Sequence, residues 1–325
     1  MLSKIAVIGL GTMGTSFARY ALPLCDTVLV YDNRQEQMET LYSRMLNDDN
    51  PYDQYPAYVD IDTNKKKIKI CPTLKELLIN APDLIIICTH KETHCEIALE
   101  AFSAGAHVLV EKPISCNLIE AKKMYEAAQS HQRFLFVEFC LHKYPEFEYL
   151  SSIVKKAEKT RPIRYQITRI AEIKDPTSLR ITASFDLQVH DVDYCLQTFG
   201  VPTNIEKDIL DPRHSRMRWT YPSGLQIDLL GQLPECHSIP FEYEFKCDFS
   251  DESSFAYSSS KNKNTRFLEK SSKEEVKEKI MLENSSAYQR ILQEVVTVIS
   301  SKKYLDVTTH PLLVSHAIAA LELIE

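Results

Sequence analysis

The segment KIAVIGLGTMGTSFARYALPLCDTVLVYD, residues Lys4–Asp32, carries the pattern from which the fold is predicted. Its first residues, Lys4–Ile8, form a largely β-branched apolar run, as in a buried parallel strand. Met13–Leu22 has helical character, and Pro23 ends this helix because proline lacks the amide donor and clashes with the preceding turn. Thr27–Tyr31 is a second β-branched run. The segment therefore predicts a strand–helix–strand unit.

Three glycines between the first strand and the helix have the spacing G-x-G-x-x-G: Gly9, Gly11 and Gly14. In this arrangement the first glycine allows a tight turn, the second lets a pyrophosphate approach the backbone, and the third lets the helix pack on the strand. The helix N-terminus offers amide groups and partial positive charge to phosphates. Asp32, at the end of the second strand, can accept hydrogen bonds from a ribose. We predict a dinucleotide site; the alternative is a glycine-rich turn without a ligand.

The bulk composition is that of an ordinary globular protein. The chain has 325 residues, which favours two domains, and 44% hydrophobic and 26% charged residues. Its net charge of −7 argues against a general surface for nucleic acid or anionic membranes. No apolar run reaches membrane-spanning length, and the first strand begins too early for a signal peptide. We therefore expect a cytoplasmic protein with no nucleic-acid or membrane partner.

The nine cysteines are scattered and form no C-x-x-C pair. Cys25 and Cys88 lie in apolar contexts and are predicted to be buried, reduced thiols. This usage favours a reducing compartment, and no metal site is predicted.

Strands and helices alternate through about the first 137 residues, which predicts a parallel sheet covered by helices on both faces. Ligands in such sheets bind outside the carboxyl ends of the strands. Polar residues follow several predicted strands, so Asp32, Thr89–His90, Glu111–Lys112 and Glu138 should surround one crevice. The predicted cofactor-binding set is Gly9, Leu10, Gly11, Thr12, Met13, Gly14, Asp32, Asn33, Arg34, Thr89, His90, His94, Glu111 and Lys112.

The pattern changes after Pro145. Helices are expected over Phe147–Lys159 and Phe185–Phe199, and the remaining segments to residue 249 have the alternation of strands. Successive strands with few helices favour a mostly antiparallel sheet. Ser250–Lys279 is predicted to be an exposed hairpin or mobile segment. Two final helices are expected, over Ser286–Ser300 and His310–Leu323.

Two sets of residues could perform proton chemistry. Asp186 and His190 are four residues apart, so both lie on one helical face with Asp193, whereas Asp191 points elsewhere. A carboxylate beside an imidazole raises its pKa and orients it, which suits a proton donor and acceptor; the alternative is an ordinary exposed pair. Lys112 follows an apolar strand and could bond a substrate oxygen, or simply be a solvated strand end.

Together these motifs resemble the Gfo/Idh/MocA oxidoreductase family, which includes glucose–fructose oxidoreductase and inositol dehydrogenase. The resemblance covers nearly the whole chain, and its most specific parts are E-K-P at Glu111–Pro113 and D-x-x-x-H at Asp186–His190. KYPEF at Lys143–Phe147 and the Tyr288 helix complete it.

The resemblance implies a Rossmann doubly wound parallel sheet over residues 1–138. It further implies a C-terminal α/β domain over residues 139–325, with a mostly antiparallel open sheet for substrate binding and for forming a homodimer or homotetramer. It implies a nicotinamide cofactor and a sugar, cyclitol or related substrate. Lys112, Asp186 and His190 correspond to the family's active-site set, with His190 as general acid–base. Lys143 and Tyr288, with Asp186 and His190, are candidate substrate contacts.

Three departures from the family pattern stand out. His90 and Lys91 replace the usual Pro and Asn, so the loop over the cofactor should differ. Lys143 replaces a common Arg. Ile181–Ser184 lacks the usual glycines, which predicts a tighter pocket floor.

Asp32 favours NAD over NADP because its charge repels a 2′-phosphate, although Arg34 could pair with that phosphate. The predicted activity is an NAD(P)-dependent dehydrogenase or reductase acting on CH–OH groups. The alternatives are a non-catalytic NAD(P)-sensing regulator on the same fold and a reductase of a non-sugar substrate such as an imine, a dihydrodiol or a linear tetrapyrrole.

Overall fold

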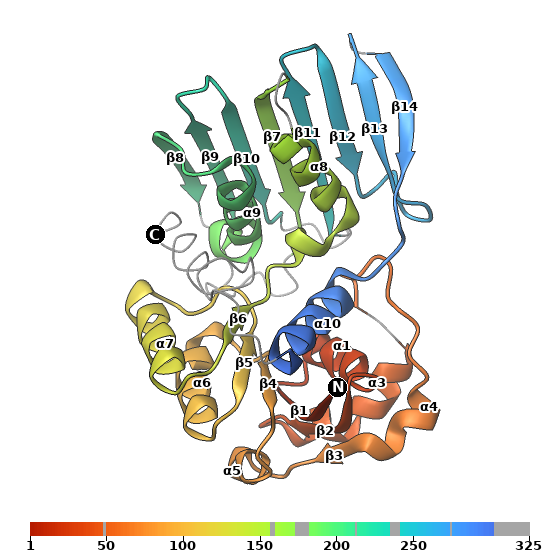
Figure 1. The fold of residues 1–325 in the computed structure, drawn as a ribbon, viewed down its shortest axis with the longest axis vertical. Coiled ribbons are helices and arrows are strands. Elements are labelled where there is room, and N and C mark those ends of the chain that lie inside the picture. The colour runs from red at the N-terminus through yellow and green to blue at the C-terminus, as the bar shows by residue number, and fades with distance from the viewer. Residues whose placement is uncertain are drawn as a thin grey trace. The chain divides into compact units, whose positions relative to one another are not determined.

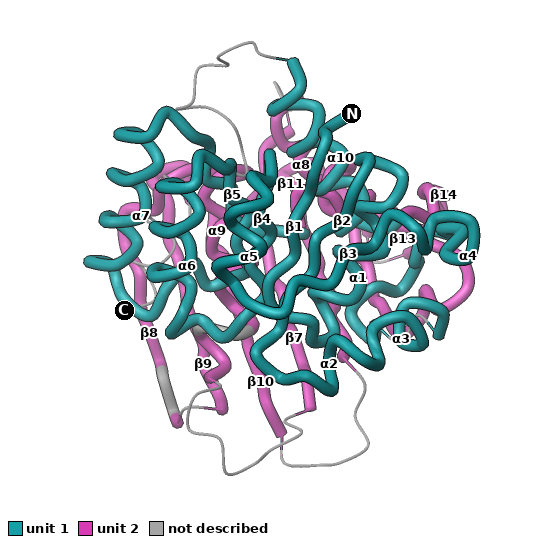
Figure 2. Tube along the Cα trace, turned by 90° about the horizontal axis from the view of Figure 1, so that it is seen from below, with its two compact units in different colours: residues 1–140, 286–323, 325 teal, residues 141–285, 324 magenta. Residues whose placement is uncertain are grey.

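The computed structural model describes residues 1–47, 50–156, 160–172, 182–211, 213–234, 241–273 and 275–301. These residues form two compact units (Figure 2). Unit 1 comprises Met1–Cys140 and the described residues from Ser286 on, and unit 2 comprises Leu141–Ser285. The helix predicted over His310–Leu323 lies outside the described residues.

The described residues of unit 1 contain a six-stranded sheet with the order β3-β2-β1-β4-β5-β6 (Figure 1). All its neighbouring strands are parallel. The central strands are continuous apolar runs because helices cover both of their faces. This order is that of doubly wound dinucleotide-binding folds, and it confirms the predicted fold class. The strands are β1 Leu2–Ile8, β2 Cys25–Tyr31, β3 Ile68–Ile70, β4 Leu84–Ile87, β5 His107–Val110 and β6 Leu135–Val137.

The helices of unit 1 begin where the sequence provides caps. The Thr73 hydroxyl accepts the amide hydrogen of Glu76 at 3.1 Å, and the Asn117 side chain accepts that of Glu120 at 3.0 Å. The elements are α1 Thr12–Ala21, α2 Gln35–Glu39, α3 Leu41–Asn47, α4 Ile61–Asn64, η1 Lys65–Lys67, α5 Leu74–Ile79, η2 Lys91–Thr93, α6 His94–Ser103, α7 Leu118–Ser130 and α10 Ala287–Ser300.

Helix α10 follows unit 2 in the sequence but packs with α1 in unit 1, as Figure 1 shows. Phe17 and Tyr288 meet edge to face, with ring centroids 6.2 Å apart. The Asp53 carboxylate accepts hydrogen bonds from Tyr20 and Ser286, each at 2.6 Å. The Ser286 hydroxyl also caps α10. A single division of the chain near residue 138 therefore does not describe where this helix packs.

Unit 2 is built on a sheet that has eight strands in the described residues, in the order β14-β13-β12-β11-β7-β10-β9-β8. Only the β7–β10 pair is parallel among the strand pairs of these residues, which confirms a mostly antiparallel sheet. The strands are β7 Pro162–Ile170, β8 Asn204–Asp211, β9 His214–Thr220, β10 Gln226–Gln232, β11 Glu242–Phe249, β12 Ser253–Ser258, β13 Phe267–Ser272 and β14 Glu275–Met281.

The expectation of an exposed hairpin or mobile segment at Ser250–Lys279 was wrong in part. β13 and β14 do form a hairpin, but β12 and β13 extend the sheet from β11. Phe255, Tyr257 and Leu268 are buried. The abundant Ser, Lys and Glu residues obscured this because in a half-buried strand they occupy the solvent-facing positions.

Helices cover one face of the unit 2 sheet. Phe147 contacts Phe245 with ring centroids 4.9 Å apart, and Tyr165 contacts Tyr194 at 6.3 Å. The helix predicted over Phe185–Phe199 instead begins with a π-helical turn, so Asp186 and His190 do not share one regular α-helix. The elements are η3 Cys140–Lys143, α8 Pro145–Lys156, the π-helical η4 Ala183–Gln188 and α9 Val189–Phe199.

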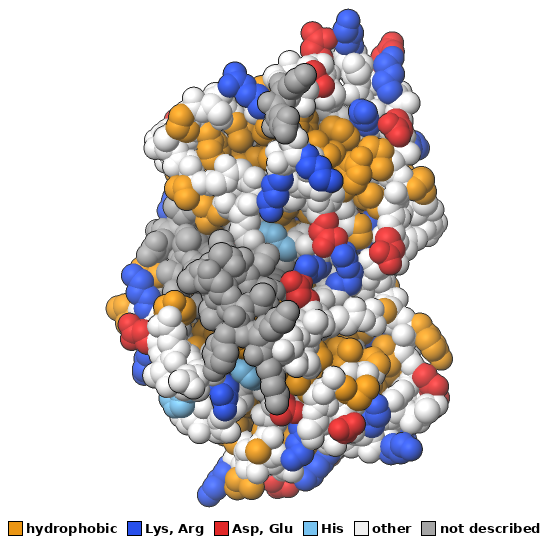
Figure 3. All heavy atoms as spheres, in the orientation of Figure 1, with side chains coloured by type: hydrophobic (Ala, Val, Ile, Leu, Met, Phe, Trp, Pro, Cys, Tyr) orange, Lys and Arg blue, Asp and Glu red, His pale blue; other side chains and the backbone are white. Residues whose placement is uncertain are grey.

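Acidic and basic side chains are interspersed over the face shown in Figure 3, with no broad basic area among the residues described there. Within the described part of the chain, every helix is too short or too polar to cross a membrane.

Candidate functional site

A groove of about 510 Å³ opens at the carboxyl ends of the central strands of unit 1. It lies beside the glycine turn and includes seven residues of the predicted cofactor-binding set, namely Gly9, Gly11, Asp32, Asn33, Arg34, Thr89 and His90. The edge of the parallel sheet thus brings Asp32 and Thr89–His90 to one groove. Glu111, Lys112 and Glu138 were expected around the same crevice, but they are not among the residues that line this groove. The contact of the groove residues with a cofactor stays a prediction.

The glycine turn has the shape that a dinucleotide needs. Gly9 has a φ of +86°, and a Cβ there would lie 2.7 Å from the Cys88 carbonyl. A Cβ on Gly14 would lie 1.8 Å from the Gly9 carbonyl oxygen. These two positions exclude a side chain, whereas a Cβ on Gly11 would meet no atom within 4 Å. Space is therefore left beside the Gly11 backbone.

Helix α1 begins at that open space. Gly11 is its N-cap and supplies no side-chain hydrogen bond, and the first turn carries no acidic residue. Thr12, Met13 and Gly14 form this turn, and their amide groups lie at the positive end of the helix dipole. The residues present therefore fit the phosphates of a dinucleotide.

Asp32 is buried at the end of β2, with an exposed fraction of 4%. Its carboxylate accepts the amide hydrogens of Leu10 at 2.7 Å and of Arg34 at 2.8 Å. The guanidinium of Arg34, whose side chain is 61% exposed, lies 3.4 Å from the same carboxylate. Oδ1 already accepts from both the amide and Nε of Arg34, whereas Oδ2, which accepts the Leu10 amide hydrogen, can accept a further hydrogen bond from a ribose hydroxyl.

Several groove residues were missed by sequence reasoning. The apolar side chains of Leu74 and Ile97 lie on the groove wall, together with Glu96 and Glu100 of α6. Leu74 and Ile97 are suited to contact a flat aromatic ring such as adenine. Only the helical spacing of Thr93, Glu96, Ile97 and Glu100 could have suggested that one face of α6 turns toward the groove.

His94 begins α6 and is buried, with an exposed fraction of 1%. Its ring nitrogens lie 3.1 Å from the carbonyl oxygens of Thr89 and Pro113. Burial lowers the pKa of this imidazole, despite these carbonyl neighbours. The ring thus connects the loop after β4 to the loop after β5. In this position His94 has a structural role beside the predicted cofactor site.

Glu111 and Lys112 follow β5 in unit 1. The Glu111 carboxylate accepts the Lys112 amide hydrogen at 3.3 Å. Burial raises the pKa of Glu111 to about 7, and the positive charge of Lys112 opposes this shift. Lys112 therefore stands beside a carboxyl group that can bind a proton near neutral pH.

Unit 2 contributes the other candidate catalytic residues. His190 is buried in the first turn of α9, with an exposed fraction of 7%, and Asp186 belongs to the preceding π-helical turn. Asp193 accepts a hydrogen bond from His142 at 2.5 Å. Asp191 accepts a hydrogen bond from Arg169 at 2.7 Å. This agrees with the expectation that Asp191 points away from the face of Asp186 and His190. Because Lys112 belongs to unit 1, its convergence with His190 stays a prediction.

The π-helical turn has an anchor that the sequence analysis missed. Gln188 is fully buried and donates hydrogen bonds to the carbonyls of Ser215 at 2.9 Å and Leu229 at 3.1 Å. A Cβ on Gly231 would lie 3.0 Å from the Gln188 side chain. The signal in the sequence was the position of the Gln188 amide between two apolar residues, Leu187 and Val189. The side chain fills space at β10. The tighter pocket floor expected from Ile181–Ser184 stays a prediction, and Ile181 lies outside the described residues.

The two remaining candidates have structural partners within their own units. Lys143 lies 3.9 Å from Glu148 in unit 2. Tyr288 is buried against Phe17 in unit 1, with an exposed fraction of 5%. Their predicted substrate contacts stay predictions.

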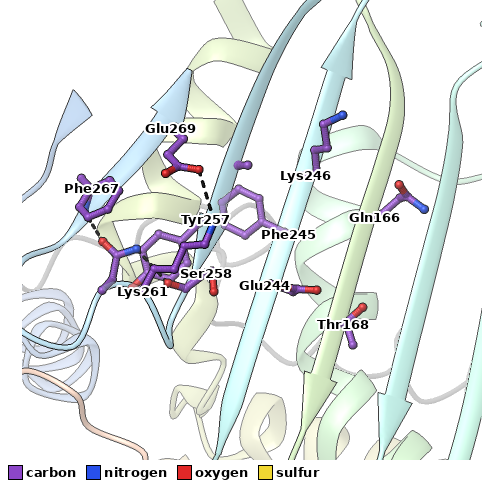
Figure 4. A pocket seen from close by; sticks show the side chains of 12 residues that line it. Gln166, Thr168, Glu244, Phe245, Lys246, Tyr257, Ser258, Lys261, Phe267 and Glu269 are labelled. Carbon is purple, nitrogen blue, oxygen red and sulfur yellow. Dashed lines mark hydrogen bonds and ion pairs between the residues drawn. The ribbon is translucent and has the colours of Figure 1, made fainter. Parts of the chain in front are cut away.

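A second cavity, of about 380 Å³, lies on unit 2 and is shown in Figure 4. Phe245 and Tyr257 are among the residues that line it, together with Lys261 and Glu269, which form an ion pair at 3.7 Å. It involves none of the predicted site residues.

Comparison with known proteins agrees with the geometry of unit 1. Residues 3–139 match the model of the oxidoreductase family with an NAD-binding Rossmann fold. An uncharacterized oxidoreductase of Escherichia coli, YhhX, is 31% identical over 66% of this chain and 59% of its own length. The myo-inositol 2-dehydrogenase of Thermotoga maritima is 25% identical over 61% of this chain and 55% of its own length. The chain thus matches little more than half the length of these relatives.

Solved structures match over almost the full length. A UDP-N-acetylglucosamine 3-dehydrogenase, GnnA from Acidithiobacillus ferrooxidans, has a TM-score of 0.76 and 19% identity, covering 100% of this chain and 96% of that one. KijD10, a 3-ketoreductase from Actinomadura kijaniata in complex with NADP, has a TM-score of 0.75 and 12% identity with the same coverage. At these identities the match establishes the fold alone.

Proposed function

Because residues 3–139 of this chain belong to the Gfo/Idh/MocA oxidoreductase family, we propose that the protein is an NAD(P)-dependent oxidoreductase acting on a sugar, sugar derivative or cyclitol. A nicotinamide cofactor bound in this groove would supply or accept the hydride at a carbinol or carbonyl carbon of the substrate. The observation that carries the proposal is the groove in unit 1, where the open Gly11 backbone, the start of α1 and Asp32 adjoin.

The chain's own residues are assigned to the remaining steps. The His190 imidazole takes or returns the hydroxyl proton, and the Lys112 ammonium donates a hydrogen bond to the same oxygen. Asp186 orients the imidazole. These roles rest on the family motifs, and sugar-related relatives support the substrate class.

NAD is the preferred cofactor in this proposal. The buried Asp32 carboxylate lies where a ribose is expected, and its negative charge disfavours a 2′-phosphate. Arg34 is exposed beside it and is the residue through which NADP could still bind.

The open face of the unit 2 sheet is the proposed contact between two copies of the chain. On this face the Asp228 carboxylate accepts hydrogen bonds from three arginines, at 2.8 to 3.4 Å: Arg164, Arg216 and Arg218. Neutral polar residues such as Gln166 and Thr168 lie on the same face. Sedimentation equilibrium should give the mass of a dimer or tetramer, and Thr168→Arg should reduce it; a monomeric wild type contradicts this contact.

The experiment that tests the function is a panel of sugars, sugar nucleotides and cyclitols, assayed with NAD and NADP in parallel. Absorbance of the reduced nicotinamide reports turnover, and calorimetry reports cofactor binding separately. Turnover of one compound class with NAD supports the proposal. Cofactor binding without turnover across a complete panel indicates a sensing protein instead, and a product from an imine or dihydrodiol indicates a non-sugar reductase. Location in the cytoplasm is part of the proposal and is testable by fractionation.

A further inference from the structure

Three residues of unit 1 lie in one row at the ends of neighbouring parallel strands. Ile87, Val110 and Val137 are paired in register across β4, β5 and β6. The next residues are Cys88, Glu111 and Glu138, and they continue the ladder. The Glu111 amide donates to Ile87 and the Glu138 amide donates to Val110, each at 2.9 Å.

Residues in register on parallel strands point to the same face, and neighbouring strands are about 4.8 Å apart. The Glu111 and Glu138 side chains therefore extend from adjacent positions on one face of the sheet. Glu138 is 1% exposed, and each residue has one buried carboxyl oxygen, Oε1, without a hydrogen-bond partner among the described residues.

Two ionised carboxylates cannot satisfy each other, because each only accepts hydrogen bonds. A single proton removes this conflict, since a protonated carboxyl group donates to its ionised neighbour. We propose that Glu111 and Glu138 share one proton and that this carboxyl pair sets the charge beside Lys112.

The surroundings of the pair agree with this assignment. Burial raises the pKa of Glu111 to about 7. Burial and the neighbouring charge of Glu111 raise the pKa of Glu138 well above its usual value. The opposing groups are the Lys112 ammonium, which lowers both pKa values, and Cys140, which hydrogen-bonds Glu138. The Cys88 thiol faces both glutamates, and its own pKa is raised by burial and by their charges.

The shared proton gives the pair one negative charge, which balances the single positive charge of Lys112. Loss of the proton leaves two negative charges on the pair, and uptake of a second proton leaves the pair with none. This charge balance matters to catalysis through the role given to Lys112, so its functional meaning rests on the proposed function. Oxidised nicotinamide is cationic, and its binding should weaken when the pair is fully protonated, whereas binding of the reduced form should change less.

The direct test is carbon-13 NMR of side-chain carboxyl groups in the full chain labelled at glutamate, followed from pH 5 to 9. The wild type should retain one protonated glutamate carboxyl near neutral pH. Glu111→Gln should remove the like charge and lower the midpoint of Glu138. Glu138→Gln resembles the protonated neighbour and should leave the midpoint of Glu111 near 7, because burial raises it. Glu126→Gln, an exposed change in α7, is the matched control and should leave the titration unchanged.

Independent titration of both carboxyls near their ordinary values in the wild type overturns the proposal, as does a Glu138 midpoint that stays unchanged in Glu111→Gln. The measurement needs no substrate. If the two carboxyl groups titrate as a coupled pair but the protein turns over no compound, the shared proton is supported and the proposed enzyme function is not. Turnover in a protein whose two carboxyl groups titrate independently supports the enzyme function and overturns the shared proton. Calorimetric Kd values for oxidised and reduced cofactor across the same pH range then test the link to Lys112.

Discussion

The Arg169 guanidinium lies 2.7 Å from the Asp191 carboxylate, directly after His190 in the chain, and both side chains are buried. Arg169 also lies over the Tyr243 ring, 5.3 Å from its centroid. The pair joins the end of β7 to the first turn of α9. It therefore holds the backbone that presents His190 within unit 2.

Asp191→Asn should destabilise the protein by about 3 to 5 kcal/mol, because the buried Arg169 guanidinium loses its ion pair with the Asp191 carboxylate. Urea unfolding followed by circular dichroism measures this. The double change Arg169→Met with Asp191→Leu should recover much of the loss, since an apolar pair needs no charge balance. A change below about 0.5 kcal/mol in Asp191→Asn, the size expected of a surface substitution, contradicts a buried ion pair.

Lys112→Met should lower kcat by about 10²- to 10³-fold while the Kd of the cofactor changes little, because a hydrogen bond to the reacting oxygen is lost. Steady-state kinetics and calorimetry separate the two effects. Lys123→Met, an exposed change in α7, is the control and should behave as the wild type. Undiminished turnover in Lys112→Met rules out the assigned role.

His190→Asn should lower kcat by about 10²- to 10⁴-fold and remove one limb of its pH profile, since the proton acceptor is lost. The exposed His131→Asn serves as its counterpart. A profile of unchanged shape in His190→Asn excludes the imidazole as the proton-transfer group, whatever the size of the loss in rate.

Asp32→Asn should raise the ratio of kcat/KM for NADP over NAD by about tenfold or more, because like charges about 4 Å apart repel by about 1 to 4 kcal/mol. The amide keeps an acceptor for the Leu10 backbone. Arg34→Ala should move the ratio in the other direction. Equal ratios in all three proteins place the ribose elsewhere in the groove.

His107 should make the protein less stable as the pH falls from about 6.5 to about 4. Burial and the neighbouring Arg133 charge lower the pKa of His107 to about 4, and its Nδ1 accepts the Phe134 amide hydrogen at 2.9 Å. Between about pH 6.5 and pH 4 this imidazole is protonated in the unfolded chain but neutral in the folded protein. Unfolding therefore takes up a proton and is favoured as the pH falls. Melting temperatures of His107→Asn should depend less on pH there; a slope equal to that of the wild type contradicts this.

Much of unit 1 was predictable because its signals are local. Apolar runs, the caps at Thr73 and Asn117, and the glycine turn each act within a few residues, and the edge rule for parallel sheets then places Asp32 and Thr89 together. The open sheet of unit 2 was predictable as a class. Its last strands, β12 to β14, were not predictable, because their polar composition is that of a loop. They become strands by pairing outward from β11.

The sequence by itself determined the glycine turn, the parallel sheet that follows from alternating strands and helices, and the family motifs. Only the tertiary structure decided that α10 returns to α1, that the helix at residue 183 begins with a π turn, and that Glu111 and Glu138 lie in one row. The physical reason is distance along the chain: a turn or cap is stabilised by neighbouring residues, whereas a register across strands depends on partners that only the folded sheet supplies.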